Sequence, residues 1–446
     1  MKEILDPKTS QEASWQYNGF DCCVTHEIYE TLLAELTSAD VRKTYERSLR
    51  KVGPTMEMSL RGIRVDQRRL IKVKRRLRDD LACLEEHFNA LCEAVVGRKV
   101  NAGSWQQVSS LLYIHLGLRG KGTRRPHLDK LAANNFYARP FITHINAIRD
   151  ARKQLGFLNA TPSDDGRMLY NLNVGGTESG RLSCRESVFW MGTNCQNIDT
   201  RHRSIFVADP GKILVEVDLE QADSRNVGAI CYALFGKDNY LKACEQFDLH
   251  SAVARMVWGD SIDPKEVYQH GKTYRDFAKR AGHGTNYMGS PRGIAGITGI
   301  PANLVKNFQE AYFATFPEIR EWHKWTRREL RQTGCITTLF GRRRFFHDRR
   351  WADGTAREAV AYQGQSMTAE ETDQGFMALW QQFPWVELLI QVHDSTLFQI
   401  PSNRLDELST LISAMKVSLP IRERAFTVPL SAKVGKSWGE MAEWTG

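Results

Sequence analysis

The chain has 446 residues, which is enough for about three domains or for one domain with large subdomains. With 42% hydrophobic and 25% charged residues, it has the composition of a globular protein and not of a disordered one. It contains no run of 18 or more apolar residues, so we expect no membrane-spanning segment and no membrane partner. Nine scattered cysteines without a CxxC pair, and an amino terminus without an apolar signal core, predict a cytoplasmic protein with reduced thiols.

The net charge of +9 arises from 61 Lys and Arg against 52 Asp and Glu, and it is localised. The window 41–80 alone holds fourteen basic and five acidic residues, which equals the whole excess. A basic stripe of this kind is expected where a protein binds a phosphate backbone, although a solvated helix face has the same composition. Motifs elsewhere in the chain have to decide between these interpretations.

Helical and strand-like patterns occupy separate stretches of the chain. Apolar residues recur at steps of three and four through 66–96 and predict a long amphipathic helix; they are Leu70, Val73, Leu77, Leu81 and Leu84. The other predicted elements are a helix at 22–50 that is interrupted by Pro54, turns and short strands at 161–184, a strand at 212–218, mainly helices at 238–330, a hairpin at 387–400 and an amphipathic helix at 403–418. Because helices and strands are segregated, the predicted fold class is α+β.

Two aspartates stand where apolar strands stop. Asp218 ends KILVEVD, and Asp394 lies at the centre of the predicted hairpin ELLIQVHDSTLFQI. A carboxylate in such a place is exposed, paired or metal-bound, because its burial alone is costly. Together the two aspartates would suit Mg²⁺, and two such ions about 4 Å apart activate a nucleophile and stabilise a leaving oxygen. The alternative is that each aspartate merely ends a strand.

A second group of polar residues follows helical spacing. Each member lies four residues after the last, so the four form one stripe on a helix: Arg275, Lys279, His283 and Tyr287. Two cations and two rings suit a nucleotide, with its phosphates on the cations and its base against a ring. A solvated helix face is the alternative, but Gly282 and Gly284 weaken a helix without such a purpose, and Gly284 could admit a close neighbour.

The order of these segments resembles that of family A DNA polymerases, the group of bacterial DNA polymerase I and many phage replicases. The resemblance covers about residues 50–446. Its elements, in family order, are MEMSLRGIRVD at 56–66, TESGRLS at 177–183, NCQNI at 194–198, VDLEQADSR at 217–225, DLHSAVA at 248–254, the Arg275–Lys279–Tyr287 spacing, FGRRR at 340–344, QVHDS at 391–395 and VPLSAKVGKSW at 428–438. Each motif alone is weak evidence, but their joint order argues against chance.

The resemblance implies a right-hand polymerase fold, which consists of a palm with an antiparallel sheet and of helical fingers and thumb. The expected boundaries are the remnant of an exonuclease domain at 1–40, the thumb at 41–160, the palm at 161–225 and 358–446, and the fingers at 226–357. The basic window 41–80 would then grip duplex phosphates.

The resemblance also implies roles for single residues. Asp218 and Asp394, with the backbone carbonyl of Leu219, would bind two Mg²⁺ ions, for which Mn²⁺ could substitute. Arg275 and Lys279 would hold the incoming triphosphate, and Lys279 would also act in catalysis by protonating the pyrophosphate. The other implied contacts are Tyr287 at the templating position, Arg181 and Gln365 in the minor groove at the primer end, Asn194, Gln196, Asn197 and Arg201 along the duplex, and His393 on the primer strand.

Three positions depart from the family pattern. Asp223 stands in place of the Glu of DYSQIELR, which blocks the ribose 2′-OH, so we expect weaker discrimination against ribonucleotides. His283 stands where Phe or Tyr is usual, so we expect altered selection of sugar-modified nucleotides. Ser395 replaces the Glu of VHDE; two carboxylates remain, so we expect catalysis to survive with a changed primer-end geometry.

The amino-terminal part contains Tyr17 and Asp21 in a YxxxD pattern. This pattern matches the last motif of the family's 3′–5′ exonuclease, and a chance occurrence in a helix is the alternative. The upstream exonuclease motifs have no room here, so we expect this chain not to proofread alone. A separate exonuclease polypeptide or other replisome proteins are candidate partners, and a truncated chain is the other explanation.

The predicted function is that of a template-directed DNA polymerase, which adds dNTPs to the 3′ end of a primer on primer-template DNA by two-metal phosphoryl transfer. A single-subunit RNA polymerase relative and a non-catalytic DNA-binding subunit are the alternatives. The acidic residue at 223 favours DNA over RNA synthesis, and the retained aspartates favour an enzyme. The compact chain predicts a phage or phage-derived origin, and thus the cytoplasm of a bacterial host.

Overall fold

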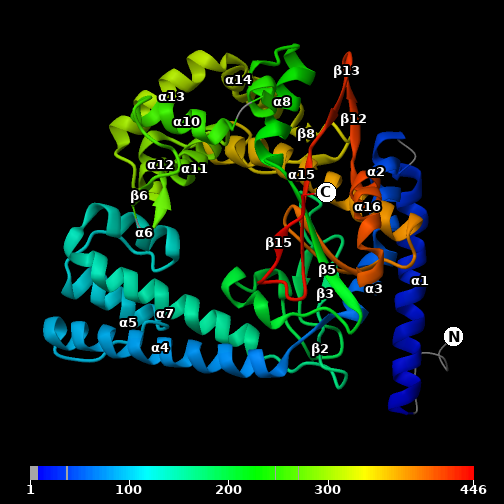
Figure 1. The fold of residues 1–446 in the computed structure, drawn as a ribbon, viewed down its shortest axis with the longest axis horizontal. Coiled ribbons are helices and arrows are strands. Elements are labelled where there is room, and N and C mark those ends of the chain that lie inside the picture. Colours follow the sequence, from blue (N-terminus) through cyan, green and yellow to red (C-terminus); the bar gives the residue numbers. More distant parts are fainter. Residues whose placement is uncertain (1–8, 37–38, 247, 270, 446) are drawn as a thin grey trace.

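A five-stranded antiparallel sheet forms the centre of the fold, and the computed structural model describes residues 9–36, 39–246, 248–269 and 271–445 (Figure 1). The strands, in spatial order, are β10 (Glu387–Val392), β11 (Ser395–Pro401), β5 (Lys212–Leu219), β14 (Leu430–Gly435) and β15 (Ala442–Glu443). The predicted strand and hairpin are therefore confirmed. The hairpin turns on His393 and Asp394, and His393 takes the left-handed conformation (φ 57°) that glycine usually supplies.

Helices pack on this sheet and enclose its apolar side chains. Two of them, α15 (Asp353–Gln382) and α16 (Leu408–Met415), contribute Phe376, Leu379 and Leu411 to the same core as Leu388 and Phe398 of the hairpin. A third, α3 (Val52–Arg61), packs against β10. The core of the sheet thus combines segments from both ends of the chain.

A helical arm extends from one end of the sheet (Figure 1). Its two long helices, α4 (Gln67–Val96) and α7 (Arg139–Leu158), run side by side, and the predicted helix at 66–96 is confirmed as α4. The helix α4 begins where Asp66 accepts a hydrogen bond from Arg69 N (3.0 Å) and ends at Gly97, which has φ 70°. The tip of the arm holds α5 (Trp105–Ser109), the π-helix η2 (Ser110–His115), the 3₁₀ helix η3 (Phe136–Ala138) and α6 (Arg125–Asn134).

A second helical layer follows β5 and has its own apolar core. Its helices are α8 (Ala222–Phe235), α9 (Asn239–Gln246), α10 (Leu249–Trp258), α11 (Tyr274–Asn286), α12 (Pro291–Thr298), α13 (Ala302–Thr315) and α14 (Pro317–Thr333). The mainly helical prediction for 238–330 is confirmed apart from one short ladder, which β6 (Val267–Gln269) forms with β7 (Lys272–Thr273). The tip helix α6 of the arm lies against α12, so that arm, helical layer and sheet form a closed circuit of elements (Figure 1).

The remaining elements are short. The two-stranded ladders are β1 (Ile63–Arg64) with β2 (Arg167–Met168), β3 (Asn171–Asn173) with β4 (Ser183–Arg185), β6 (Val267–Gln269) with β7 (Lys272–Thr273), β8 (Cys335–Thr337) with β9 (Arg343–Phe345), and β12 (Ser418–Ile421) with β13 (Arg424–Thr427). The other 3₁₀ helices are η4 (Cys195–Asn197), η5 (Thr200–Ile205) and η6 (Ser402–Glu407). The turns and short strands predicted at 161–184 are confirmed.

Two predictions of helix boundaries were wrong. The helices α2 (Ala39–Arg50) and α3 meet at Lys51, and Pro54 lies within the first turn of α3, where its missing N–H costs nothing. Pro54 therefore does not interrupt a helix. The amphipathic helix expected at 403–418 is divided, because η6 precedes α16.

The amino-terminal helix α1 (Ser10–Leu36) lies at the outer edge of the molecule (Figure 1). It carries exposed apolar side chains, among them Trp15, Phe20 and Ile28. None of the α1 side chains that the structure describes belongs to one of the four hydrophobic clusters.

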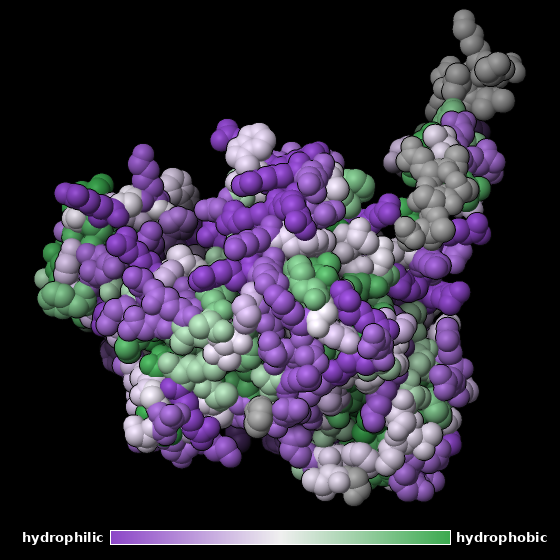
Figure 2. All heavy atoms as spheres, turned by 90° about the horizontal axis from the view of Figure 1, so that it is seen from above, coloured by the Kyte–Doolittle hydropathy of each residue, from purple (hydrophilic) through white to green (hydrophobic). Residues whose placement is uncertain are grey.

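The face seen in Figure 2 is mainly hydrophilic, with apolar residues in small scattered groups. In the described part of the chain, no helix is both long enough and apolar enough to traverse a bilayer.

Candidate active site

The sheet brings the two predicted aspartates together. In the register of β5, Asp218 pairs with Ser395 of β11 on one side and with Ser431 of β14 on the other. The backbone N–H of Leu219 donates to the carbonyl of Asp394 (3.2 Å). Because Asp394 lies in the two-residue turn beside the end of β5, both carboxylates lie at one end of the central strands.

Burial, Asp394 and Glu216 raise the pKa of Asp218 to about 7, and Lys433 and Lys279 act in the opposite direction. Carboxylates placed this close repel one another unless a proton or a cation lies between them. Two carboxylates and a nearby backbone carbonyl are hard oxygen donors of the kind Mg²⁺ prefers. Within the described ranges, no group of three or more His, Cys, Asp or Glu side chains could hold a metal, so further ligands would have to come from backbone, water or substrate.

Sequence analysis overlooked Glu216, a third carboxylate beneath this pair. It lies two residues before Asp218 and so on the same face of β5. Trp438 donates to it from Nε1 (2.9 Å), and Arg203 lies 3.7 Å away. The alternation of KILVEVD would have revealed this face. Because Glu216 is engaged by both neighbours, it shapes the field around Asp218 while staying tied to the protein.

The predicted cationic stripe lies on α11. This helix begins with a capping box, in which Thr273 and Asp276 bond each other's backbone N–H groups. Lys279 and His283 line a cavity of about 400 Å³, together with Lys272, Asp276 and Arg280. The expectation for Gly284 is met, because a Cβ there would lie 2.8 Å from the side chain of Ile294 on α12. A Cβ at Gly282 would lie 3.9 Å from the side chain of Val253, which is an ordinary contact distance.

Arg275, at the start of the stripe, is already paired. Its Nε and Nη2 donate to the carboxylate of Asp248 at 2.7 and 3.1 Å. Burial acts to raise the pKa of Asp248, but hydrogen bonds from Arg275 and Ser251 lower it to about 2. An incoming triphosphate would therefore have to compete with Asp248 for this guanidinium.

The other end of the stripe lies close to α8, the helix that carries Asp223 of the segment VDLEQADSR. His283 Nδ1 lies 3.5 Å from Asp223 on α8, and the ring of His250 lies 5.6 Å from that of His283. Burial first, and then His283, Lys279 and Arg275, lower the pKa of His250 to about 3. His250 was missed, although it stands in the quoted segment DLHSAVA. Sequence spacing within one helix could not reveal a contact between two helices.

Two further predicted residues adjoin Asp223. Tyr287 caps the end of α11, and its pKa is raised well above the usual value by burial and by Asp223. Its hydroxyl approaches α15, where a Cβ on Gly364 would lie 3.1 Å from it. Arg181 acts on Asp223 electrostatically and lowers its pKa against the effect of burial, together with His283. Arg181, Asp223, His283 and Tyr287 therefore form one cluster.

The residues expected along a duplex surround the hairpin turn. Gln196 donates to the carbonyl of Gln391 (2.8 Å), and Gln391 in turn donates to the carbonyl of His393 (2.6 Å), whose side chain is exposed. Asn194 donates to the carbonyl of Cys184. Of the other predicted residues, Asn197 is exposed, Arg201 is exposed and paired with Asp199, and Gln365 is half-buried on α15.

The basic window is not a single stripe. Lys51 is 1% exposed, and its Nζ lies 2.6 Å from Asp373 on α15. Arg61 donates to the carbonyl of Leu388 (2.7 Å). The exposed cations of the window lie on two helices: Arg42, Lys43 and Arg50 on α2, and Arg68, Lys72, Arg75, Arg76 and Arg78 on α4. Thus only part of the charge excess faces solvent.

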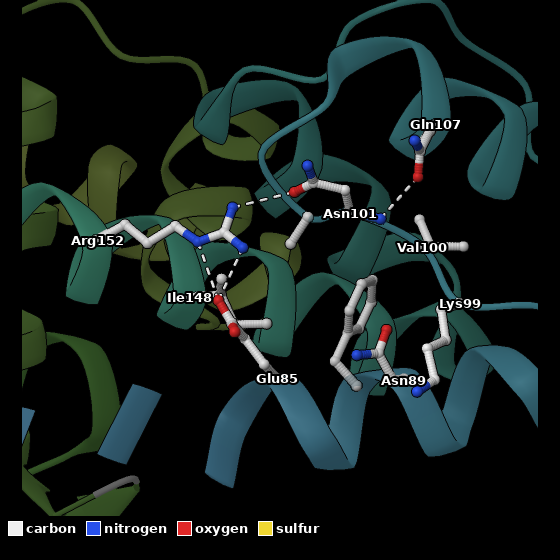
Figure 3. A pocket seen from close by; sticks show the side chains of 10 residues that line it. Glu85, Asn89, Lys99, Val100, Asn101, Gln107, Ile148 and Arg152 are labelled. Atoms are coloured by element: carbon white, nitrogen blue, oxygen red, sulfur yellow. Dashed lines mark hydrogen bonds and ion pairs between the residues drawn. The ribbon is translucent and has the colours of Figure 1, made fainter. Parts of the chain in front are cut away.

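A separate pocket of about 320 Å³ lies in the arm, between α4, α7 and the loop before α5 (Figure 3). Arg152 donates to Glu85 (2.7 and 3.0 Å) and to Asn101 (3.0 Å), and Gln107 accepts from the backbone N–H of Asn101 (2.8 Å). These polar groups satisfy one another, so the pocket is a junction between helices and takes no part in the site above.

The structure thus places two aspartates at one end of the central strands and a row of basic residues on α11, and sequence comparison identifies the family. The chain matches the model of DNA polymerase family A over residues 67–440 and therefore belongs to that family.

Among its relatives, DNA polymerase I of Chloroflexus aurantiacus is 28% identical over 99% of this chain and 48% of its own length. The thermostable DNA polymerase I of Thermus thermophilus is 27% identical over 97% of this chain and 53% of its own length. The chain thus spans about half the length of these curated relatives. It is also similar to the solved POL domain of Pol1 from M. smegmatis in complex with DNA primer-template and dNTP, with a TM-score of 0.78 and 26% identity over 94% of this chain and 74% of that one.

Proposed function

We propose that this chain is a template-directed DNA polymerase that adds dNTPs to the 3′ end of a primer. The observation that carries the proposal is the pairing of Asp218 with Asp394 at the end of the central strands, within electrostatic reach of Lys279 on α11. The relative from M. smegmatis supports it, since that structure contains primer-template and dNTP. The match to a DNA polymerase family disfavours the RNA polymerase alternative.

In this proposal Asp218, Asp394 and the carbonyl of Leu219 hold two Mg²⁺ ions, with Mn²⁺ as a substitute. Bound ions of this kind activate the attacking hydroxyl and stabilise the leaving oxygen. Lys279 and Arg275 orient the triphosphate, and Lys279 donates a proton to the pyrophosphate. Phosphoryl transfer needs mainly positioning and charge stabilisation, which a rigid sheet opposite a cationic helix provides.

The cluster of Arg181, Asp223, His283 and Tyr287 would receive the sugar and the templating base. Arg181 and Gln365 would contact the primer end, and the residues around the hairpin would position the duplex; these are Asn194, Gln196, Asn197, Arg201 and His393. We assign the thumb to 41–160, the fingers to 226–357 and the palm to 161–225 and 358–446. The exposed cations of α4 support the thumb's role as a grip on phosphates.

Primer extension tests the proposal. The native chain, on a primed DNA template with Mg²⁺, should extend with dNTPs, and Asp394→Ala should abolish extension while duplex binding persists. Asp21→Ala, at an exposed position of α1, is the matched carboxylate control and should extend normally. Extension with NTPs alone would favour an RNA polymerase, and duplex binding without extension would favour a structural subunit.

We also propose that this chain does not proofread alone and that a separate exonuclease polypeptide or other replisome proteins assist it. Tyr17 and Asp21 lie one turn apart on α1, and both side chains are exposed to solvent. Excision of mismatched primer ends by the purified chain would contradict this. Phage origin and the host cytoplasm stay predictions; the relatives named above are bacterial.

A further inference from the structure

The segment after β4 displays three apolar side chains in succession. Val188, Phe189 and Trp190 are 60%, 52% and 90% exposed. Trp190 also has a left-handed backbone (φ 55°), which costs a bulky residue free energy unless the surroundings impose it. An exposed aromatic side chain on a strained backbone indicates that a ligand outside the chain binds to it.

The turn that presents Trp190 is held firmly. Ser187 is buried, and it accepts from Phe189 N at Oγ (3.1 Å) and from Trp190 N at its carbonyl (3.2 Å). Gly192 (φ 78°) closes the turn against the backbone of Leu169, where a Cβ would collide with the carbonyl oxygen. The backbone of the turn is therefore held in place, so that only the side-chain torsions of Trp190 have to be ordered when it binds.

Both ends of this turn belong to the proposed DNA surface. Arg181 lies just before β4, and Asn194 follows the turn and donates back to Cys184 of β4. Gln196 then connects to the hairpin that carries His393. The exposed ring thus continues a surface that the proposed function already gives to nucleic acid.

The small size of the apolar patch of Val188, Phe189 and Trp190 indicates which kind of ligand it can bind. Stable protein–protein interfaces bury about 800 Å² on each partner, which three side chains on one turn cannot provide. One indole matches one nucleobase, and stacking of this kind tolerates any base. Within a duplex the base faces are covered by their neighbours, so only an unpaired base offers a free face.

We propose that Trp190 is a stacking site for an unpaired nucleobase of the DNA substrate. This inference rests on the proposed function. Arg185 and Glu186 beside the turn have opposite charges, so the contribution of Trp190 should not depend on salt, unlike the phosphate contacts of the same complex.

Fluorescence anisotropy with labelled single-stranded dT20 tests the proposal on the full chain. Trp190→Ala should weaken binding by about five- to a hundredfold, equally at 50 and 200 mM salt, and Trp190→Phe should restore most of the affinity. Trp15→Ala, which removes a 62% exposed indole from α1, should leave the affinity unchanged. An unfolding midpoint temperature equal to that of the native chain would show that the variants are folded.

An abasic strand of the same length separates stacking from backbone contacts. Native and Trp190→Ala chains should bind it equally. The proposal is overturned if Trp190→Ala binds dT20 like the native chain, or if it loses affinity for the abasic strand as well. Failure of the native chain to extend a primer would reject the proposed function, whereas the loss of dT20 affinity in Trp190→Ala would still stand.

Discussion

The carboxylate of Asp223 lies 3.5 Å from Nδ1 of His283, a contact to an imidazole nitrogen that a Phe or Tyr at 283 could not make. The carboxylate thus lies beside α11, and the aspartate is one methylene shorter than the glutamate usual in the family. Both effects leave more room where a 2′-hydroxyl would lie. This residue-level geometry supports the expectation of a looser sugar gate.

We therefore expect Asp223→Glu to discriminate against ribonucleotides more strongly than the native chain, by about tenfold or more. The measurement is kcat/KM for single incorporation of dATP and of ATP opposite the same template base. Equal discrimination by both proteins would refute the gate interpretation.

The buried carboxyl group of Glu371 leads to a prediction about how the stability of the fold depends on pH. It is buried on α15, accepts from Asn226 Nδ2 (2.9 Å), and burial raises its pKa to about 8. Since the folded state holds this proton more tightly than the unfolded state, its contribution to stability is complete below about pH 4.5 and is lost as pH rises through about 8.

Glu371→Gln should remove this contribution. In urea unfolding between pH 5 and 8, the free energy of unfolding of the native chain should fall relative to the variant by at most about 1.4 kcal/mol per pH unit. The other titrating groups are common to both proteins and cancel in the difference. A constant difference over this range would show that Glu371 is ionised.

At the level of elements, the pair of Lys51 and Asp373 joins α3 to α15. Both side chains are almost fully buried, and burial raises the pKa of Asp373 to about 6 while Lys51 opposes this. Lys51→Met would leave a buried carboxylate unpaired and should cost about 3–5 kcal/mol of unfolding free energy.

Urea denaturation measures this cost. The double variant Lys51→Met, Asp373→Leu should recover most of the loss, because an apolar pair replaces the ionic one. If the single and the double variant lose the same free energy of unfolding, the destabilisation comes from packing and not from the loss of the ion pair.

The helices and strands also show which features could be predicted from the sequence and which could not. Apolar spacing predicted α4 and the hairpin because both signals are local, and the aspartates could be paired because each ended a strand. The partners of Lys51, Arg275 and Asp223 could not be predicted, since each lies on another element. The same holds for His250 and Glu216, whose neighbours are set by packing between helices and strands.

For the whole molecule, α1 should be dispensable for stability. Because its described side chains contribute to none of the hydrophobic clusters, a chain of residues 39–446 should unfold within about 0.5 kcal/mol of the full chain. Urea unfolding of both chains checks this. A loss of several kcal/mol would mean that α1 packs on the body of the protein in solution.

The central sheet has a consequence for synthesis on the ribosome. The core of the arm contains only residues between Leu81 and Ile148, so it can close early, whereas β5 needs β11 and β14, which emerge after the whole helical layer. Contacts between such distant segments form slowly. A nascent chain paused before residue 430 would therefore carry a closed arm core, while Asp218 still stood on a strand with an open edge.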